Sequence, residues 1–126
     1  GGIHTAQNCA IKNALGEYIT RIDSDDYLLP DCLKNYDMAL DSIPSEKRNV
    51  IAGVVGLCMN LKDMTVRGTS FPKDSQITKG YLLARKGVTG DKNFCIRTSV
   101  MKEFLIPEHE DTKWVPEGGV LWFDVY

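Results

Sequence analysis

Three carboxylates fall within four residues in the stretch Asp23-Ser24-Asp25-Asp26. An apolar run over residues 18–22 precedes it, and residues 17–22 are predicted to form a strand that delivers Asp23 to its carboxyl end. Carboxylates this close together repel one another unless a positive group lies among them. Mg²⁺ and Mn²⁺ take oxygen ligands and hold phosphate at their other positions. The stretch therefore predicts a site for a divalent metal ion.

Helix capping is the alternative explanation of the same residues. An Asp side chain commonly accepts a hydrogen bond from the first amides of a helix, and Pro30 is typical of a helical first turn. Capping needs one Asp and leaves the other two unexplained. Two roles stay open for Asp26, which either orients the metal and its ligands or caps the helix that begins near Pro30.

The rest of the chain alternates helical and strand patterns. Apolar residues recur at helical spacing over residues 3–15 and 30–43, and Gly16 is expected to end the first helix in the left-handed conformation. The further segments are a buried strand over 49–60, a hairpin arm over 64–67, a short helix from Asp74 or Ser75 to about Arg85, a strand over 93–97 and a short helix over 98–104. This order predicts an α/β domain with a mostly parallel sheet flanked by helices. In such sheets ligands bind beyond the carboxyl ends of the strands.

Composition narrows the class of protein. A chain of 126 residues with 43% apolar and 25% charged residues suits one soluble globular domain. The net charge of −2 and the lack of a basic block argue against a nucleic-acid partner, and no apolar run approaches the roughly 20 residues that span a bilayer. The cysteines have no CxxC spacing, so we expect reduced, buried thiols in a cytoplasmic protein and no zinc site; they are Cys9, Cys32, Cys58 and Cys95.

Two blocks of the sequence resemble family 2 glycosyltransferases, which have the GT-A fold. The first block consists of Gly2, Ala6-x-Asn8, Ala14-x-Gly16-Glu17-Tyr18-Ile19, Ile22-Asp23-Ser24-Asp25-Asp26 and Pro30. The second consists of Gly90-Asp91-Lys92, the run from Phe94 to Lys102, and Ile106-Pro107-Glu108. The resemblance implies a partial GT-A domain that transfers a sugar from a nucleotide-diphosphate donor to a hydroxyl of a carbohydrate or other acceptor, with inversion at the anomeric carbon.

The resemblance also implies roles for residues of the first block. The Asp-x-Asp motif of the family matches Asp23 and Asp25. Asp25 would bind Mn²⁺ or Mg²⁺, and Asp23 would contact the same ion or the ribose of the donor. In the family the first helix lies near the donor diphosphate, so His4 and Asn8, one helical turn apart, are expected to contact it. For His4 the alternative is an exposed position without a ligand.

An acidic residue in the last part of the chain is expected to act as general base. The family usually carries a Glu-Asp pair there, and a carboxylate of this kind would take the proton from the acceptor hydroxyl. In this chain Gly118 follows Glu117 and breaks the pair, whereas the literal pair is Glu110-Asp111. Glu117 is the first candidate and Asp111 the second. The alternative for Glu117 is a place in a helical first turn, where the helix dipole favours acid.

The first strand–helix–strand unit of the family has no counterpart in this sequence. We therefore expect residues 1–126 to form one domain, namely the central and acceptor-side part of a glycosyltransferase domain without the unit that binds the base. Such a fragment is expected to be inactive by itself and to self-associate through an exposed sheet edge. The resemblance implies bacterial polysaccharide synthesis, in the cytoplasm or at the inner face of the membrane.

Two other functions stay open. A non-catalytic module of the same fold would bind a sugar nucleotide or a partner without turning it over, and the broken Glu-Asp pair favours this alternative. A phosphohydrolase would use Asp23 as its nucleophile and a lysine such as Lys92 in support. The spacing of the first block favours the transferase over the phosphohydrolase.

Overall fold

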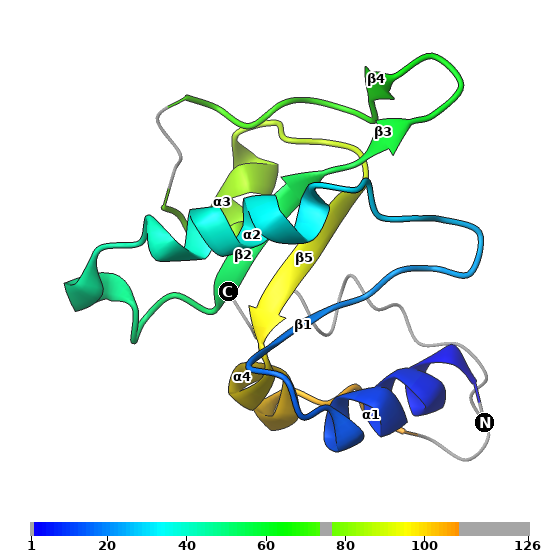
Figure 1. The fold of residues 1–126 in the computed structure, drawn as a ribbon, viewed down its shortest axis with the longest axis vertical. Helices are drawn as coiled ribbons and strands as arrows, with labels where there is room; N and C mark the ends of the chain where they lie inside the picture. Colours follow the sequence, from blue (N-terminus) through cyan, green and yellow to red (C-terminus); the bar gives the residue numbers. More distant parts are fainter. Residues whose placement is uncertain (1, 74–76, 109–126) are drawn as a thin grey trace.

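The computed structural model describes residues 2–73 and 77–108 of the chain (Figure 1). Its elements are α1 (Ile3–Asn13), β1 (Tyr18–Thr20), α2 (Cys32–Asp41), the short 3-10 helix η1 (Ser45–Lys47), β2 (Gly53–Leu57), β3 (Met59–Asn60), β4 (Thr65–Val66), α3 (Gly80–Arg85), β5 (Lys92–Arg97) and α4 (Thr98–Glu103). The predicted helices and strands are present in the predicted order, and most are shorter than predicted. Among the described residues, no helix has the length and apolar character needed to cross a bilayer.

A three-stranded sheet in the order β1-β5-β2 carries the fold. Both outer strands are antiparallel to β5, so that Thr20 of β1 and Val54 of β2 both lie opposite Cys95. Gly53 permits this close pairing, because a Cβ at that position would collide with the Cys95 carbonyl. Since β1 and β2 are each antiparallel to the same strand, they run in the same direction.

The expectation of a mostly parallel sheet is not confirmed, because every strand pair within residues 2–73 and 77–108 is antiparallel. The alternation of strands and helices correctly indicated that β1 and β2, which α2 connects, share a direction. It carried no information that β5, a strand from much later in the chain, lies between them. The described part of the chain therefore contains both helices and strands, as predicted, but its strand pairs are antiparallel.

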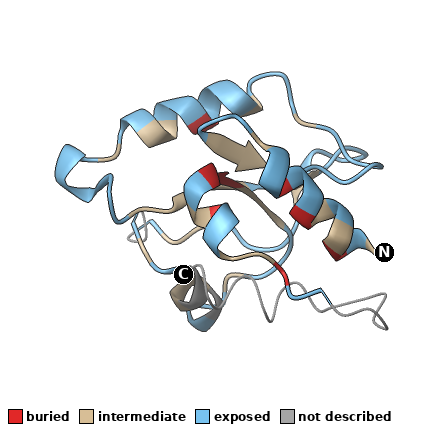
Figure 2. Cartoon of the chain, turned by 90° about the horizontal axis from the view of Figure 1, so that it is seen from below, coloured by how far each residue is buried: buried red, intermediate tan, exposed pale blue. Residues whose placement is uncertain are grey.

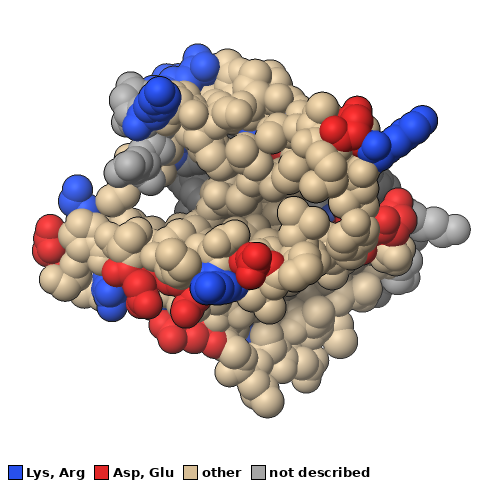
Figure 3. All heavy atoms as spheres, turned by 45° about the horizontal axis from the view of Figure 1, so that its top comes forward, with Lys and Arg blue, Asp and Glu red and all other residues tan. Residues whose placement is uncertain are grey.

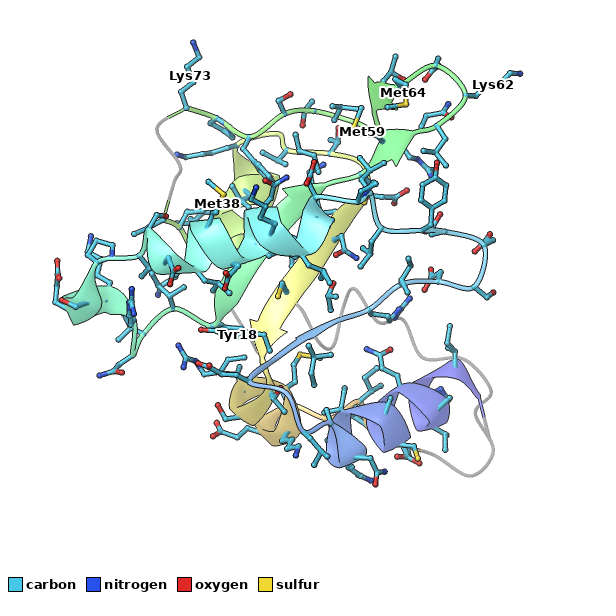
Figure 4. The ribbon with its side chains drawn as sticks, in the orientation of Figure 1. Tyr18, Met38, Met59, Lys62, Met64 and Lys73 are labelled. Atoms are coloured by element: carbon cyan, nitrogen blue, oxygen red, sulfur yellow. The ribbon has the colours of Figure 1, made fainter. Side chains whose placement is uncertain are left out.

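The helices cover different parts of this sheet. In Figure 1, α2 crosses in front of β2 and β5, while α1 and α4 lie together at one end of the sheet. The predicted hairpin of β3 and β4 lies at the other end, and Figure 4 shows Met59, Lys62 and Met64 on it. At the junction of β5 and α4, the Thr98 N–H donates to the Glu17 carbonyl at 2.8 Å. This bond fixes the start of α4 to the loop between α1 and β1.

The hydrophobic core lies where α1, β5 and α4 meet. Its buried members are Ile11, Ile96, Met101 and Ile106. Figure 2 shows buried positions on α1 and mostly exposed ones on α2. Burial of each such side chain contributes about 1.5–3 kcal/mol. The core therefore holds α1 and α4 in place against the strand that occupies the centre of the sheet.

Candidate functional site

The acidic turn, residues 23–26, follows β1 as predicted. The Asp26 N–H donates to the Asp23 carbonyl at 3.1 Å, which closes the turn. Beside it, Arg21 Nε donates to Asp23 Oδ1 at 3.0 Å, and Arg21 Nη2 lies 3.0 Å from the same oxygen. Asp23, Asp25 and Asp26 are all exposed. The guanidinium thus supplies one positive charge to the carboxylate cluster and leaves Asp25 and Asp26 in contact with solvent.

The side chain of Asn93, on β5, connects the segment before the acidic turn to α2. Its Nδ2 donates to the Arg21 carbonyl at 2.7 Å. Its Oδ1 accepts from the Thr20 hydroxyl at 2.7 Å and from the Tyr36 hydroxyl at 2.7 Å. This role of Asn93 was not predicted from the sequence. The available signal was an amide side chain next to the apolar run Phe94-Cys95-Ile96 of the same strand.

Tyr36 reaches Asn93 from the buried face of α2, where its exposed fraction is 7%. Gly56 of β2 leaves room for the ring, because a Cβ there would lie 2.7 Å from the Tyr36 hydroxyl. Burial raises the pKa of the Tyr36 hydroxyl above its usual value, and the neighbouring Cys32 thiol raises it further. At neutral pH the hydroxyl therefore stays protonated and donates to Asn93.

The Gly-Asp-Lys triplet of the second block begins at a tight crossing of two loops. Gly68 and Gly90 have φ angles of 84° and 80°, and a Cβ on Gly90 would lie 2.6 Å from the Gly68 Cα. Across this crossing, Arg67 Nη2 pairs with Asp91 Oδ2 at 3.1 Å. Only glycine combines the left-handed conformation with such a close backbone approach. The crossing therefore fixes the position of Asp91.

The Cys58 thiol, between β2 and β3, is influenced by charges from both the acidic turn and the triplet. Burial raises the pKa of Cys58, the carboxylates of Asp91 and Asp26 raise it further, and the Lys92 ammonium lowers it. The pairing of β1 with β5, and the bond from Asn93 to the Arg21 carbonyl, bring the two blocks of the sequence together.

The donor set of the acidic turn fits a hard divalent cation. Asp23 and Asp25 offer carboxylate oxygens, and Mg²⁺ is usually held by one or two carboxylates, with phosphate and water at its other positions. Such a site needs no cage of three protein ligands. In the part of the chain that the structure describes, no group of three His, Cys, Asp or Glu side chains gathers to hold a metal ion. Metal binding by Asp23 and Asp25 therefore stays a prediction.

His4 and Asn8 lie on one face of α1, as predicted, but both are buried, with exposed fractions of 1%. The alternative of an exposed His4 is therefore wrong. Asn8 Nδ2 donates to the Ile106 carbonyl at 2.7 Å and to Glu108 Oε1 at 2.8 Å, and Asn8 Oδ1 accepts from the Ile106 N–H at 3.0 Å. Asn8 thus holds the segment that follows α4. The predicted contacts of His4 and Asn8 with a donor diphosphate stay predictions.

Glu108, at the end of the second block, is held against α1 as a carboxylate. The hydrogen bond from Asn8 lowers the pKa of Glu108, and the Lys12 ammonium, 3.8 Å away, lowers it further. The segment that leads to the candidate bases is thus anchored at this residue. Asp111 and Glu117 themselves lie outside the described residues.

A mixed domain of helices and strands, with an acidic turn directly after its first strand, is what the resemblance implied. The model of the family described as Glycosyl transferase family 2 matches residues 1–101. The matched range includes the acidic turn, Asn93 and the whole three-stranded sheet. This chain therefore belongs to glycosyl transferase family 2.

Two curated proteins are similar to part of this chain. They are the chondroitin synthase of Pasteurella multocida (strain Pm70) and the hyaluronan synthase of Pasteurella multocida, and each is 46% identical to it over 56 residues. Each match covers 40% of this chain and 6% of the relative's length. The chain thus corresponds to a small part of either relative. No solved structure matches it.

Proposed function

We propose that the protein transfers a sugar from a nucleotide-diphosphate donor to a hydroxyl of a carbohydrate acceptor, with inversion at the anomeric carbon. Membership of glycosyl transferase family 2 supports the transfer of a sugar. The two relatives are named as synthases of chondroitin and of hyaluronan, which supports a role in bacterial polysaccharide synthesis. We place this reaction on the cytoplasmic side, at the inner face of the membrane.

The acidic turn after β1, which leaves the carboxylates of Asp23 and Asp25 exposed, is the observation that carries this proposal. Asp23 and Asp25 would hold Mn²⁺ or Mg²⁺ there. When bound, the ion neutralises negative charge on the departing diphosphate. Arg21 pairs with Asp23 and so keeps one carboxylate oxygen at a fixed place in the turn. This pairing lowers the repulsion among the three carboxylates before any cation arrives.

Glu117 is the proposed general base, with Asp111 as the second candidate. Either carboxylate would accept the proton of the acceptor hydroxyl as that oxygen attacks the anomeric carbon. A general base contributes about 10²- to 10⁴-fold to a rate. In the complete protein, replacing the true base by its amide should therefore lower kcat by at least about 100-fold. Comparison of Glu117→Gln with Asp111→Asn decides which of the two residues is the base.

The metal site is tested by Asp25→Asn in the complete protein. Because the substitution removes one proposed ligand, Mn²⁺-dependent transfer from a nucleotide-diphosphate sugar should fall by about 100-fold or more. Asp37→Asn is the matched control, since Asp37 is also an exposed aspartate and lies on α2, and it should leave transfer unchanged. Transfer that survives both Asp25→Asn and chelation of divalent ions would remove the metal from the mechanism. Absence of any transfer, with donor binding intact, would favour the non-catalytic module.

A further inference from the structure

We propose that Asn93 is a positioning residue for the acidic turn, and that its side chain sets the affinity of the turn for a divalent cation. The inference rests on the proposed metal-dependent transfer. The hydrogen bonds that the structure describes for the Asn93 side chain go to Thr20, Arg21 and Tyr36, all of which lie outside residues 23–26. Asn93 would thus act through the backbone of Arg21 and not as a ligand.

The backbone pairing of β1 with β5 ends just before the turn. Its last register pair is Thr20 with Cys95. Beyond this pair, a side chain of β5 replaces the backbone pairing: Asn93 Nδ2 donates to the carbonyl of Arg21 at 2.7 Å. Asn93 is thus the group that connects the sheet to the chain at the point where it leaves for the acidic turn.

Arg21 transmits this constraint to the turn. Its carbonyl is held by Asn93, while its guanidinium holds Asp23 Oδ1 and donates from Nη1 to Gln7 Oε1 at 2.9 Å. Backbone and side chain of one residue are therefore fixed from three sides: by β5, by α1 and by the turn. A shift of the Arg21 backbone would move the charged partner of Asp23 and, with it, the carboxylate.

Only an amide side chain makes this set of bonds at the same position. Asn93 Oδ1 accepts from the hydroxyls of Thr20 and Tyr36, while Nδ2 donates to Arg21. A carboxylate would keep the acceptor and lose the donor. The oxygen side fastens the residue to β1 and α2, and the nitrogen side reaches toward the turn. Substitutions can therefore remove the hydrogen bonds of the oxygen and those of the nitrogen separately.

The experiment compares Asn93→Ala with Tyr36→Phe in the complete protein, both kept well below their melting temperatures. The readouts are the Kd for Mn²⁺, followed through the electron paramagnetic resonance of the free ion, and the exchange rate of the Asp26 amide. Loss of a residue that orients a metal ligand typically weakens metal binding by about 10- to 100-fold. Asn93→Ala should therefore raise the Kd at least about tenfold and speed the exchange of Asp26.

Tyr36→Phe is the control because it removes one donor to Asn93 Oδ1 from the α2 side and keeps the bond to the Arg21 carbonyl. It should lower the melting temperature without changing either readout. A merely structural role for Asn93 would make the two variants alike, with unchanged Kd and exchange, and that result would overturn the inference.

Asn93→Asp covers the case in which the alanine variant does not fold. It keeps the acceptor oxygen and loses the donor, and its added negative charge would by itself strengthen Mn²⁺ binding. A higher Kd for this variant therefore supports the inference, and an unchanged or lower Kd contradicts it. If the unsubstituted protein fails to bind Mn²⁺, the proposed metal site falls. The exchange of Asp26 in the Asn93 variants then decides the positioning role by itself.

Discussion

At the scale of single residues, the buried amide of Asn8 shows how a resemblance and a structure give different kinds of information. The spacing of His4 and Asn8 correctly predicted a shared helical face. It did not predict that this face is covered by the segment around Ile106, because a periodic pattern shows that a face is buried or shared but not which segment lies against it. Asn8 now has a definite structural task that sequence reasoning missed.

Replacement of Asn8 by alanine should destabilise the domain. The change leaves the N–H and the carbonyl of Ile106 without their partner in a buried place. Each unsatisfied buried group costs about 1–3 kcal/mol, so the free energy of unfolding should fall by about 2–6 kcal/mol. Urea denaturation measures it. Asn13→Ala on the same helix is the control, because the Asn13 bond to the Cys9 carbonyl is exposed. Equal losses in both variants would contradict the role assigned to Asn8.

Glu108 makes stability depend on pH in a defined direction. Its pKa is lowered in the folded protein by the hydrogen bond from Asn8 and by Lys12. The unfolded chain therefore binds the proton more readily, so this contribution to stability is complete above the ordinary pKa of a glutamate side chain and is lost as the pH falls through the lower, folded pKa. Unfolding by urea should become easier over this range, and less so for Glu108→Gln. Identical pH profiles of the two proteins would refute the contribution.

At the scale of elements, the sequence predicted which segments are helices and strands and the hairpin of β3 and β4, but missed how the strands of the three-stranded sheet pair. Periodicity reports the spacing of buried positions within a segment, and the partner of a strand is decided by the rest of the chain. The sequence also did not show which glycines adopt the left-handed conformation. Gly16 was expected in the left-handed conformation at the end of α1, whereas the glycines with positive φ among the described residues are Gly68, Gly87 and Gly90. A glycine can adopt a positive φ at any position, and only the tertiary structure shows which glycines do so.

The loop crossing that holds Asp91 should be sensitive to a methyl group at Gly90. Alanine in the left-handed conformation costs about 1–2 kcal/mol by itself. At Gly90 its Cβ would also press on the backbone of the other loop at Gly68, so the loss of unfolding free energy should exceed that range. Gly87→Ala is the control, because Gly87 has a φ of 77° and a methyl group added there would meet no atom within 4 Å. Urea denaturation of both variants gives the comparison, and equal losses would mean that the loops lie further apart.

At the scale of the whole molecule, one core joins the two ends of the described chain. Ile11 from α1 and Ile106 from the segment after α4 belong to the same buried cluster. Figure 3 shows small, separate groups of acidic and basic side chains on one face, in agreement with the modest net charge of −2. The sequence could predict this balance of charge and the number of apolar residues. It could not predict that the first and last described elements close one core, because contacts between distant segments leave no local pattern.

The cysteines report on the opening of this core. Cys9 is exposed on α1, while Cys95 is buried in the central strand, and burial raises the pKa of its thiol. A thiol reagent should therefore modify Cys9 at once and Cys95 only when the sheet opens, at a rate that follows global unfolding. Mass spectrometry of labelled peptides distinguishes the two sites. In Cys9→Ser the rapid labelling of the peptide that contains position 9 should vanish, while the slow labelling of the Cys95 peptide should remain. Labelling of both thiols at similar rates would show that the sheet opens locally.

The central position of β5 has a consequence for the order of events on the ribosome. Among the described residues, β1 and β2 have β5 as their only partner in the three-stranded sheet, and β5 is the last strand to be made. A nascent chain that has released β1, α2 and β2 still lacks the strand that joins them. Contacts between distant segments slow folding. We therefore expect the domain to stay open to chaperones until translation has carried Arg97 out of the exit tunnel.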